Sequence, residues 1–469
     1  MDCGLGLGED RGRTVTSERF DAVVLGAGFA GLSAAAVLAD RGCRVLVLEA
    51  SSRLGGRAAS FRDGATGEQV DNGQHVLFGC YHETRRFLDR IGAAGGLRVA
   101  ADLDVVSVTP EGESTRFICP SLPPPFNLLA GVLEWRALAW RDRLAVLRLA
   151  GPLRLARREL LGGDVCATSA GETVTGWLTR HGQTARIREL LWDPLALAAL
   201  NQSPDVAAAP TFVRALAMMT GSSCSDAAVA LLLLPLRDLY AEPARRFIEA
   251  RGGEVRLTTA GRLRLDQGRV VGVDAGAVRV ETAVAISAVP WFALAGLFGD
   301  RPPEEMGMTC QNAGQMESSP IVTVNLWLDR PVLDRPFVGL PGRSMQWVFD
   351  KGQIFGGTAS YLSLVSSGAS DLTSASTDTL IALATDEIRS AFPAGGEAVI
   401  TRATVVREPR ATFSLAPGQP SRPGTETPLD GLFLAGDWTD TGLPATIEGA
   451  VQSGHLAAVA TLAYLHVAG

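Results

Sequence analysis

The sequence lacks the patterns that mark secreted, zinc-binding or membrane-spanning proteins. Its seven cysteines are odd in number and scattered, and none forms a CxxC pair, which argues against a disulfide framework or a zinc site. Residues 1–19 are rich in glycine and charge and lack the apolar core of a secretory signal, so we expect a disordered leader. The most apolar stretch, 227–236, contains a proline and is shorter than the roughly 18 residues of a membrane span. These absences favour a cytoplasmic protein.

An excess of positive charge is also missing. The net charge is -7, and no basic stripe carries interleaved aromatic residues, so nucleic acid is not an expected partner. Hydrophobic residues make up 46% of the chain and charged residues 20%, which is too apolar for a disordered protein. A length of 469 residues exceeds what one core usually serves and predicts two domains.

The first motif lies in a strand, turn, helix, strand pattern over 20–50. The turn reads GAGFAG, from Gly26 to Gly31: Gly26 makes the tight turn, Gly28 lets the backbone approach a pyrophosphate, and Gly31 lets helix and strand pack closely. Phe29 and Ala30 begin the helix, whose free N–H groups face the phosphates. Glu49 follows Gly31 by 18 residues, where an acid binds ribose hydroxyls. The pattern predicts a dinucleotide site.

A second glycine loop follows directly. Glu49 opens the run EASSRLGGR, which includes Ala50, Arg53, Gly55, Gly56 and Arg57; the two glycines permit another close backbone approach, and Arg57 can neutralise a diphosphate. The order of GxGxxG, acid and GGR resembles the amine oxidase and phytoene desaturase group of flavoproteins. The resemblance implies that the cofactor is FAD, with no metal.

The C-terminal run LFLAGDWTDTGLPATIEGAVQSGHLAA resembles the second flavin motif of that group. The resemblance implies that Gly436 and Asp437 meet the ribityl and pyrophosphate part. It also implies that a helix starting near Thr446 and Ile447 points its N-terminus at the flavin. Two further stretches join this set: GGEVRLTTAGRL, where Gly261 replaces the usual apolar residue beside the adenine, and the GQH turn with Gly73 and Gln74.

These motifs predict an α/β fold with a discontinuous, Rossmann-like FAD-binding domain and an inserted α+β substrate domain. The FAD-binding domain takes residues 20–99, 241–290 and 414–469, and includes a β-meander over 254–289. The substrate domain takes residues 100–240 and 291–413.

The chain resembles one family more closely than it resembles the group at large. The blocks that carry the resemblance are VDNGQHVLFGCYHETRRFLDRIGA (from Val70), LLWDPLALAALNQSPDVAAA (from Leu190), LLLPLRDLYAEPARRFIEARGG (from Leu232), VTVNLWLDRPV (from Val322) and MQWVFDKG (from Met345). They resemble the hydroxysqualene dehydroxylases of hopanoid biosynthesis, also called squalene-associated FAD-dependent desaturases. The resemblance implies that reduced FAD delivers hydride to an allylic carbon of hydroxysqualene as water departs, which gives squalene; nothing in the sequence identifies the electron donor.

This chemistry needs an acid to protonate the leaving hydroxyl, and two residues are candidates. His75 lies in the GQH turn, although a histidine there could equally well only hydrogen-bond the cofactor or a carbonyl. Asp193 stands among apolar residues that would raise its pKa, although it could also be a helix cap before Pro194.

A triterpene substrate resides in the bilayer, so an interfacial surface is expected. From 126 to 158 the chain carries seven arginines, at 136, 141, 143, 148, 154, 157 and 158, against two acids. In a helix over 126–149, Leu133, Trp140, Leu144 and Leu147 would share one face flanked by arginines, which is typical of a membrane-facing helix and equally of one that covers a core.

Three other functions stay open. A carotenoid-type desaturase would run the redox chemistry in the oxidative direction on a similar polyene. An amine oxidase is disfavoured, because Lys351 is the only lysine, Thr323 stands where that family carries one, and the chain has four tyrosines. A flavin-bound lipid carrier would bind without turnover.

Overall fold

The computed structural model describes residues 17–64, 67, 69–160, 162, 167–221, 223–299, 301–357 and 360–468. The predicted leader is too long by three residues, because Ser17–Arg19 form strand β1 and pair in parallel with β14 (Val278–Glu281). Glu18 forms an ion pair with Arg256, and Phe20 is buried directly after the strand. These contacts order the segment; residues 1–16 lie outside the described part.

A parallel sheet of five strands forms the centre of the dinucleotide-binding region. Its order is β11 (Glu254–Arg256), β3 (Val45–Leu48), β2 (Ala22–Leu25), β15 (Ala285–Ser287) and β21 (Leu432–Leu434). Strands of this sheet are short apolar runs because both faces are covered. Val24 and Val47 pack with the helices on one face, whereas Leu25 and Leu48 belong to the cluster on the other.

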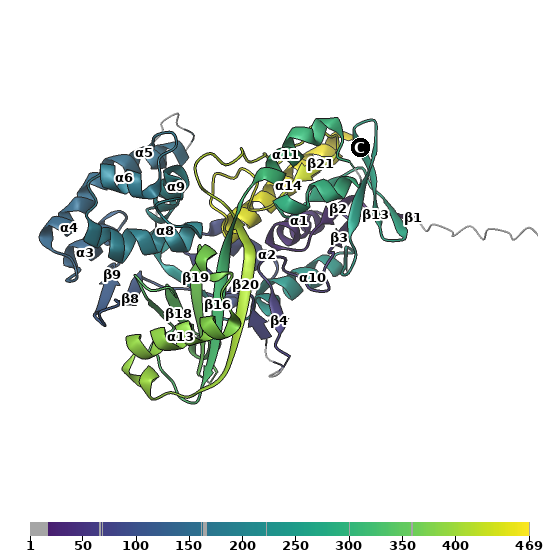
Figure 1. The fold of residues 1–469 in the computed structure, drawn as a ribbon. Helices are drawn as coiled ribbons and strands as arrows, with labels where there is room; N and C mark the ends of the chain where they lie inside the picture. Colours follow the sequence, from purple (N-terminus) through teal and green to yellow (C-terminus); the bar gives the residue numbers. More distant parts are fainter. Residues whose placement is uncertain are drawn as a thin grey trace, which may run out of the picture.

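Four helices cover the first face, namely α1 (Phe29–Asp40), α2 (His82–Arg90), α10 (Glu242–Glu249) and α14 (Ile447–Ala468). Helices α1 and α14 lie side by side (Figure 1), and a Cβ on Gly454 would come within 2.1 Å of the Ala30 carbonyl oxygen. The opposite face packs against β12 (Gly261–Asp266), β13 (Arg269–Ala275) and β14, which form the predicted meander.

A second, mixed sheet has seven strands. Its order is β20 (Ile400–Phe413), β16 (Ser318–Leu328), β19 (Ser360–Ser367), β18 (Trp347–Asp350), β17 (Phe337–Gly339), β8 (Asp104–Val108) and β9 (Ser114–Ile118). Helix α13 (Thr377–Ala391) covers one face, where Leu380 and Ala384 pack with Val322 and Val324. Side chains alternate along a strand, so Ile321 and Thr323 of β16 point to the other face.

Helices gather at one end of the molecule (Figure 1): α3 (Phe126–Glu134), α4 (Trp140–Ala145), α5 (Ala150–Leu160), α6 (Val174–Arg180), α8 (Asp193–Leu200) and α9 (Ala209–Met219). The single helix predicted over 126–149 is wrong, because α3 ends at Glu134. Trp135 and Leu138 turn inward and are buried, with the Trp135 ring 4.7 Å from that of Phe117. Burial of these two large side chains outweighs continuation of the helix.

The segment before α10 packs with a different domain from the one predicted. Strand β10 (Val229–Leu232) sits between β6 (Val76–Phe78) and β7 (Leu97–Val99) in a three-stranded sheet. Tyr240 stacks on Phe29 of α1 with ring centroids 3.6 Å apart. Residues 229–240, assigned above to the substrate domain, thus pack with the first dinucleotide-binding segment, because their apolar side chains complete its core.

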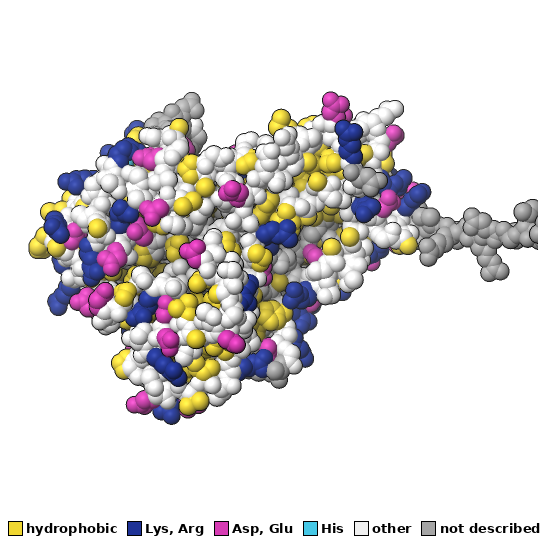
Figure 2. All heavy atoms as spheres, viewed as in Figure 1, with side chains coloured by type: hydrophobic (Ala, Val, Ile, Leu, Met, Phe, Trp, Pro, Cys, Tyr) yellow, Lys and Arg dark blue, Asp and Glu magenta, His cyan; other side chains and the backbone are white. Residues whose placement is uncertain are grey.

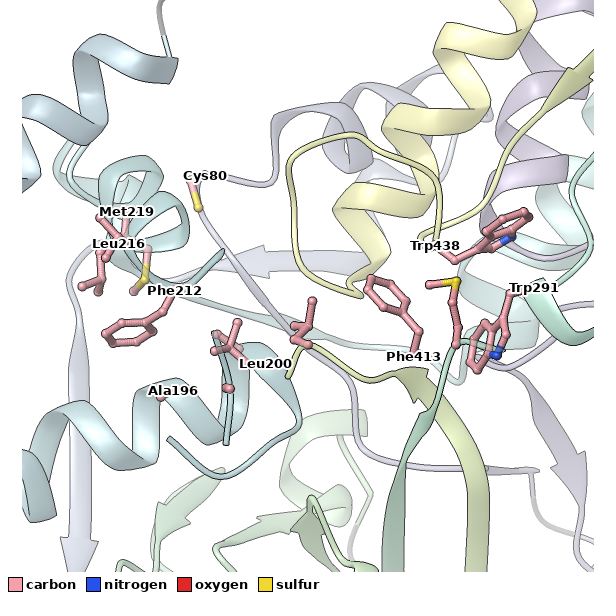
Figure 3. Packing of buried hydrophobic residues seen from close by; sticks show 14 of the residues in the cluster. Cys80, Ala196, Leu200, Phe212, Leu216, Met219, Trp291, Phe413 and Trp438 are labelled. Atoms are coloured by element: carbon pink, nitrogen blue, oxygen red, sulfur yellow. The ribbon is translucent and has the colours of Figure 1, made fainter. Parts of the chain in front are cut away.

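The apolar core runs without interruption from the helical end to the C-terminal loop. Figure 3 shows Ala196 and Leu200 of α8 and Phe212, Leu216 and Met219 of α9 at one side, and Phe413, Trp291 and Trp438 at the other. This continuity joins the substrate-domain segments to the dinucleotide-binding segments around one interior.

Candidate functional site

One large cavity of about 1150 Å³ lies between the two sheets and the helical end. Its volume exceeds the roughly 300–1,000 Å³ of a usual single-ligand pocket. At one end it is lined by the glycine motifs, and elsewhere mostly by apolar side chains of α3, α5, α8, α9 and the seven-stranded sheet, with Arg154 and Arg157 of α5 among the polar exceptions. The cavity can therefore hold a dinucleotide and a long apolar molecule together.

All the residues predicted to bind FAD line this cavity except Gly31 and Arg53. Gly31 has the packing role expected of it, since a Cβ there would stand 1.9 Å from the Gly26 carbonyl oxygen. Arg53 is exposed, and its backbone N–H and carbonyl oxygen are both hydrogen-bonded to the Ser51 hydroxyl.

The two glycine loops face each other across the end of the cavity. Gly26 has φ +108°, and Gly55 and Gly56 have φ +112° and +58°, conformations that favour glycine. A Cβ on Gly28 would meet only the Gly55 carbonyl oxygen at 3.8 Å and the Gly56 Cα at 4.0 Å. The space that a side chain at Gly28 would fill is thus part of the cavity, and it fits the backbone approach that a pyrophosphate requires.

Glu49 directly follows β3 and lines the cavity wall. Its carboxylate accepts hydrogen bonds from the backbone N–H of Ala27 at 2.8 Å and of Ser51 at 2.9 Å. Gly261, at the start of β12, lies beside this strand, where a Cβ would come within 2.5 Å of Leu25 and 3.0 Å of Leu48. Glycine at position 261, in place of the family's usual apolar residue, therefore allows close contact between the two sheets.

The GGR loop and the C-terminal motif meet through an ion pair. Arg57 donates to both oxygens of Asp437, one at 3.1 Å, and to the Ala411 carbonyl oxygen at 3.2 Å. Thr446 and Ile447, at the start of α14, line the cavity nearby. Two residues 380 positions apart, Arg57 and Asp437, thus bring the two motifs into one wall, as the flavin-site interpretation predicts.

Lys351, the chain's only lysine, is hydrogen-bonded to the GQH turn. The Lys351 ammonium donates to Asp71 at 3.2 Å and to the Gln74 side-chain oxygen at 2.6 Å, and Gln74 in turn donates to the His75 carbonyl oxygen at 3.0 Å. Lys351 is 3% exposed, and burial lowers its pKa while Asp71 opposes the shift. In the sequence this lysine bears only on amine oxidation, and no local pattern indicates its place beside the turn.

The two candidate acids are in different positions. His75 lines the cavity, and its buried Nε2 atom has no hydrogen-bond partner among the described residues. Burial lowers the pKa of His75 to about 4, so the imidazole is neutral at pH 7. Asp193 does not line the cavity. Its side chain lies 3.7 Å from the Arg188 guanidinium and is 31% exposed, and burial raises its pKa. The helix that carries Asp193 turns Pro194 and Leu195 to the cavity instead.

One acidic residue at the cavity escaped sequence reasoning. Glu408 of β20 lines the wall and accepts a hydrogen bond from the Asn72 side-chain nitrogen at 3.1 Å. No local motif surrounds it, and only strand pairing brings it to the site. Within the described ranges, no cluster of side chains could hold a metal ion.

Comparison with known proteins places the chain in a family. The profile described as flavin-containing amine oxidoreductase matches residues 29–462. A hydroxysqualene dehydroxylase of Sinorhizobium fredii is 31% identical over 93% of this chain and 96% of its own length; one of Rhodopseudomonas palustris is 31% identical over 94% and 98%. A 15-cis-phytoene desaturase of an Oncidium hybrid cultivar is 28% identical over 94% and 77%.

Solved structures agree on the fold. An oxidoreductase from Methanosarcina mazei matches with a TM-score of 0.71 at 18% identity, covering 93% of this chain and 99% of its own. A putrescine oxidase bound to putrescine matches with a TM-score of 0.70 at 18% identity, covering 96% and 100%. The predicted fold class is confirmed. The chain belongs to the flavin-containing amine oxidoreductase family and, within it, to the hydroxysqualene dehydroxylases.

Proposed function

We propose that this protein binds FAD and converts hydroxysqualene to squalene by reductive dehydroxylation. The observation that carries the proposal is one large cavity, in which the dinucleotide motifs open directly into a mostly apolar chamber. Membership of the hydroxysqualene dehydroxylases supports the choice of substrate.

The residues present fit FAD. Gly28 and Gly56 leave room for the pyrophosphate, Glu49 lies where a ribose is expected, and Arg57 with Asp437 closes the other side. When bound and reduced, the flavin supplies the electrons that the reaction consumes.

The chamber itself provides the rest of the environment. Leu128, Val132, Leu153, Leu195 and Phe349 are among the apolar side chains that line it. Loss of an allylic hydroxyl leaves a delocalised cation, and a wall of this kind keeps water from capturing the cation. The chain therefore binds and orients the polyene and shelters the reacting carbon.

The assay is anaerobic incubation of the photoreduced holoenzyme with hydroxysqualene, followed by extraction and mass analysis. We expect squalene to form in proportion to the reduced flavin consumed. If the oxidised enzyme instead introduces double bonds into squalene and the reduced enzyme leaves hydroxysqualene intact, the protein is a desaturase. No turnover in either state would indicate a lipid carrier.

We also propose that the protein docks on the membrane by its helical end. Phe126, Trp140, Leu144 and Leu147, hereafter the docking patch, are 60%, 66%, 51% and 48% exposed. Figure 2 shows hydrophobic side chains among basic and acidic ones at this end of the molecule, and Leu147 also lines the cavity. A lipid surface would cover the patch and lie at the mouth of the chamber. Among the described helices, none is long and apolar enough to cross a bilayer.

Charge reversal around the docking patch should weaken membrane binding. Arg143 is unsuitable for this test, because it donates to the carbonyl oxygens of Leu133 and Leu138 at 2.7 and 2.8 Å and stabilises the end of α3, whereas Arg148 is exposed and makes one longer bond, to the Gly182 carbonyl oxygen at 3.3 Å. We expect the change of Arg136, Arg141 and Arg148 together to glutamate to weaken the free energy of binding to anionic liposomes by about 3 kcal/mol, at about 1 kcal/mol each. Co-sedimentation with the liposomes measures the loss.

A matched triple variant controls for net charge: Arg279, Arg301 and Arg389, all exposed and away from the patch, changed to glutamate. This variant should bind like the unmodified protein. Equal binding by both triple variants would refute the docking proposal.

A further inference from the structure

The cavity offers few groups that could protonate a leaving hydroxyl. Among the described residues, its acidic lining consists of Glu49, Glu408 and Asp437. Both oxygens of Glu49 accept backbone N–H groups, and both oxygens of Asp437 are bound by Arg57. One carboxylate oxygen of Glu408 accepts a hydrogen bond from Asn72. The other oxygen accepts none from any described residue. Glu408 is the acidic side chain in the lining with an oxygen left to act on a ligand.

Strand register turns Glu408 toward the chamber. Ile321 of β16 is paired with Ser367 of β19 on one side and with Glu408 of β20 on the other. Directly paired residues share a face of a sheet, and all three line the cavity. The register shifts between Ser319 and Ile321, and irregularities of this kind re-aim side chains next to active sites.

Two hydrogen-bond systems tie this part of β20 to the GGR loop. Asn72 donates to Glu408 and, at 2.8 Å, to the Arg57 carbonyl oxygen, while its own side-chain oxygen accepts from the Ala59 N–H at 3.1 Å. Arg57 donates to the carbonyl oxygen of Ala411, three residues after Glu408. Glu408 is thereby held where the predicted cofactor wall meets the apolar chamber.

We propose that Glu408 is the catalytic acid of the dehydroxylation, a role that deepens the proposed function and rests on it. The carboxyl gives its proton to the substrate hydroxyl, the C–O bond breaks with its electron pair on oxygen, and water leaves. The carbon, now two electrons short, is reduced at the expense of reduced flavin, and Glu408 remains as a carboxylate. His75 is neutral at pH 7 and carries no proton that an imidazolium would give.

The surroundings suit the carboxylate that remains after proton transfer. Once the proton has left, the carboxylate faces a cation across a medium of low dielectric constant, where opposite charges attract strongly. The Asn72 amide stays in place throughout and keeps the carboxyl oriented.

The primary test compares Glu408→Gln with Glu397→Gln, a matched change at a side chain that is 80% exposed on the surface. Under anaerobic conditions with photoreduced enzyme, we expect Glu408→Gln to lower kcat for hydroxysqualene by about 100-fold or more, with KM and FAD content unchanged. Glu397→Gln should behave as the unmodified protein. Normal turnover by Glu408→Gln would overturn the inference.

A second substrate separates acid catalysis from a structural role. An analogue in which chloride replaces the hydroxyl needs no proton to leave, so Glu408→Gln should process it at nearly the rate of the unmodified enzyme. Equal slowing of both substrates would contradict the assignment.

A third readout does not depend on turnover. Infrared difference spectra of the oxidised holoenzyme with and without squalene should show a protonated carboxyl that Glu408→Gln lacks; its presence in both proteins would oppose the proposal. If the unmodified enzyme itself fails to convert hydroxysqualene, the proposed function fails, which is a separate result.

Discussion

Replacement of Gly28 by valine is expected to abolish FAD binding while the protein still folds. A Cβ at this position meets nothing closer than the Gly55 carbonyl oxygen at 3.8 Å, so the side chain can be accommodated by the protein. Its methyl groups would instead project into the cavity beside Gly28, where the pyrophosphate is expected to lie. Flavin absorbance per mole of purified protein measures the loss, and far-UV circular dichroism reports the fold.

Two other glycines provide controls. Gly314 lies exposed on α11 (Gly307–Gln315) with nothing within 4 Å of its Cβ position, so Gly314→Val should retain full flavin. Gly31→Val should fail to fold, because its Cβ would overlap the Gly26 carbonyl oxygen at 1.9 Å. Full flavin occupancy in Gly28→Val would be incompatible with the proposed pyrophosphate path.

Replacement of Lys351 by methionine should lower the free energy of unfolding by about 3–5 kcal/mol, the usual result of removing one partner of a buried ion pair. Methionine preserves most of the side-chain volume but leaves Asp71 buried without its cation. Among the described residues, Asp71 would keep only the hydrogen bonds that its other oxygen accepts, from the Ser60 hydroxyl at 2.7 Å and the Leu236 N–H at 3.0 Å. Urea unfolding of the holoenzyme, followed by tryptophan fluorescence, measures the change.

A double variant isolates the charge. Lys351→Met combined with Asp71→Asn removes both charges, so it should recover part of the loss. Arg389→Met, at an exposed position, should change stability little. If the single and double variants are equally destabilised, the effect comes from lost side-chain contacts, including the one to Gln74, and the ion pair is not its source.

The corrections share a physical origin. The predicted helix over 126–149 breaks because Trp135 and Leu138 find a buried position that amphipathic spacing alone cannot reveal. Asp193 has the apolar neighbours in sequence that suggested an acid at the site, yet helix geometry turns it toward Arg188 and turns Pro194 to the cavity. In both cases the direction that a side chain takes, into the core or away from the cavity, depends on packing that apolar spacing in the sequence does not show.

The sequence by itself determined the dinucleotide motifs and the family. Gly26, Gly31, Gly55 and Gly56 are required by backbone angles and close approaches within short stretches, so their meaning is readable without the rest of the chain. Only the tertiary structure placed Glu408 and Lys351 beside the site. Glu408 reaches Asn72 across 336 residues and Lys351 reaches Asp71 across 280, through strand register and burial, and no local pattern encodes a contact formed at that separation.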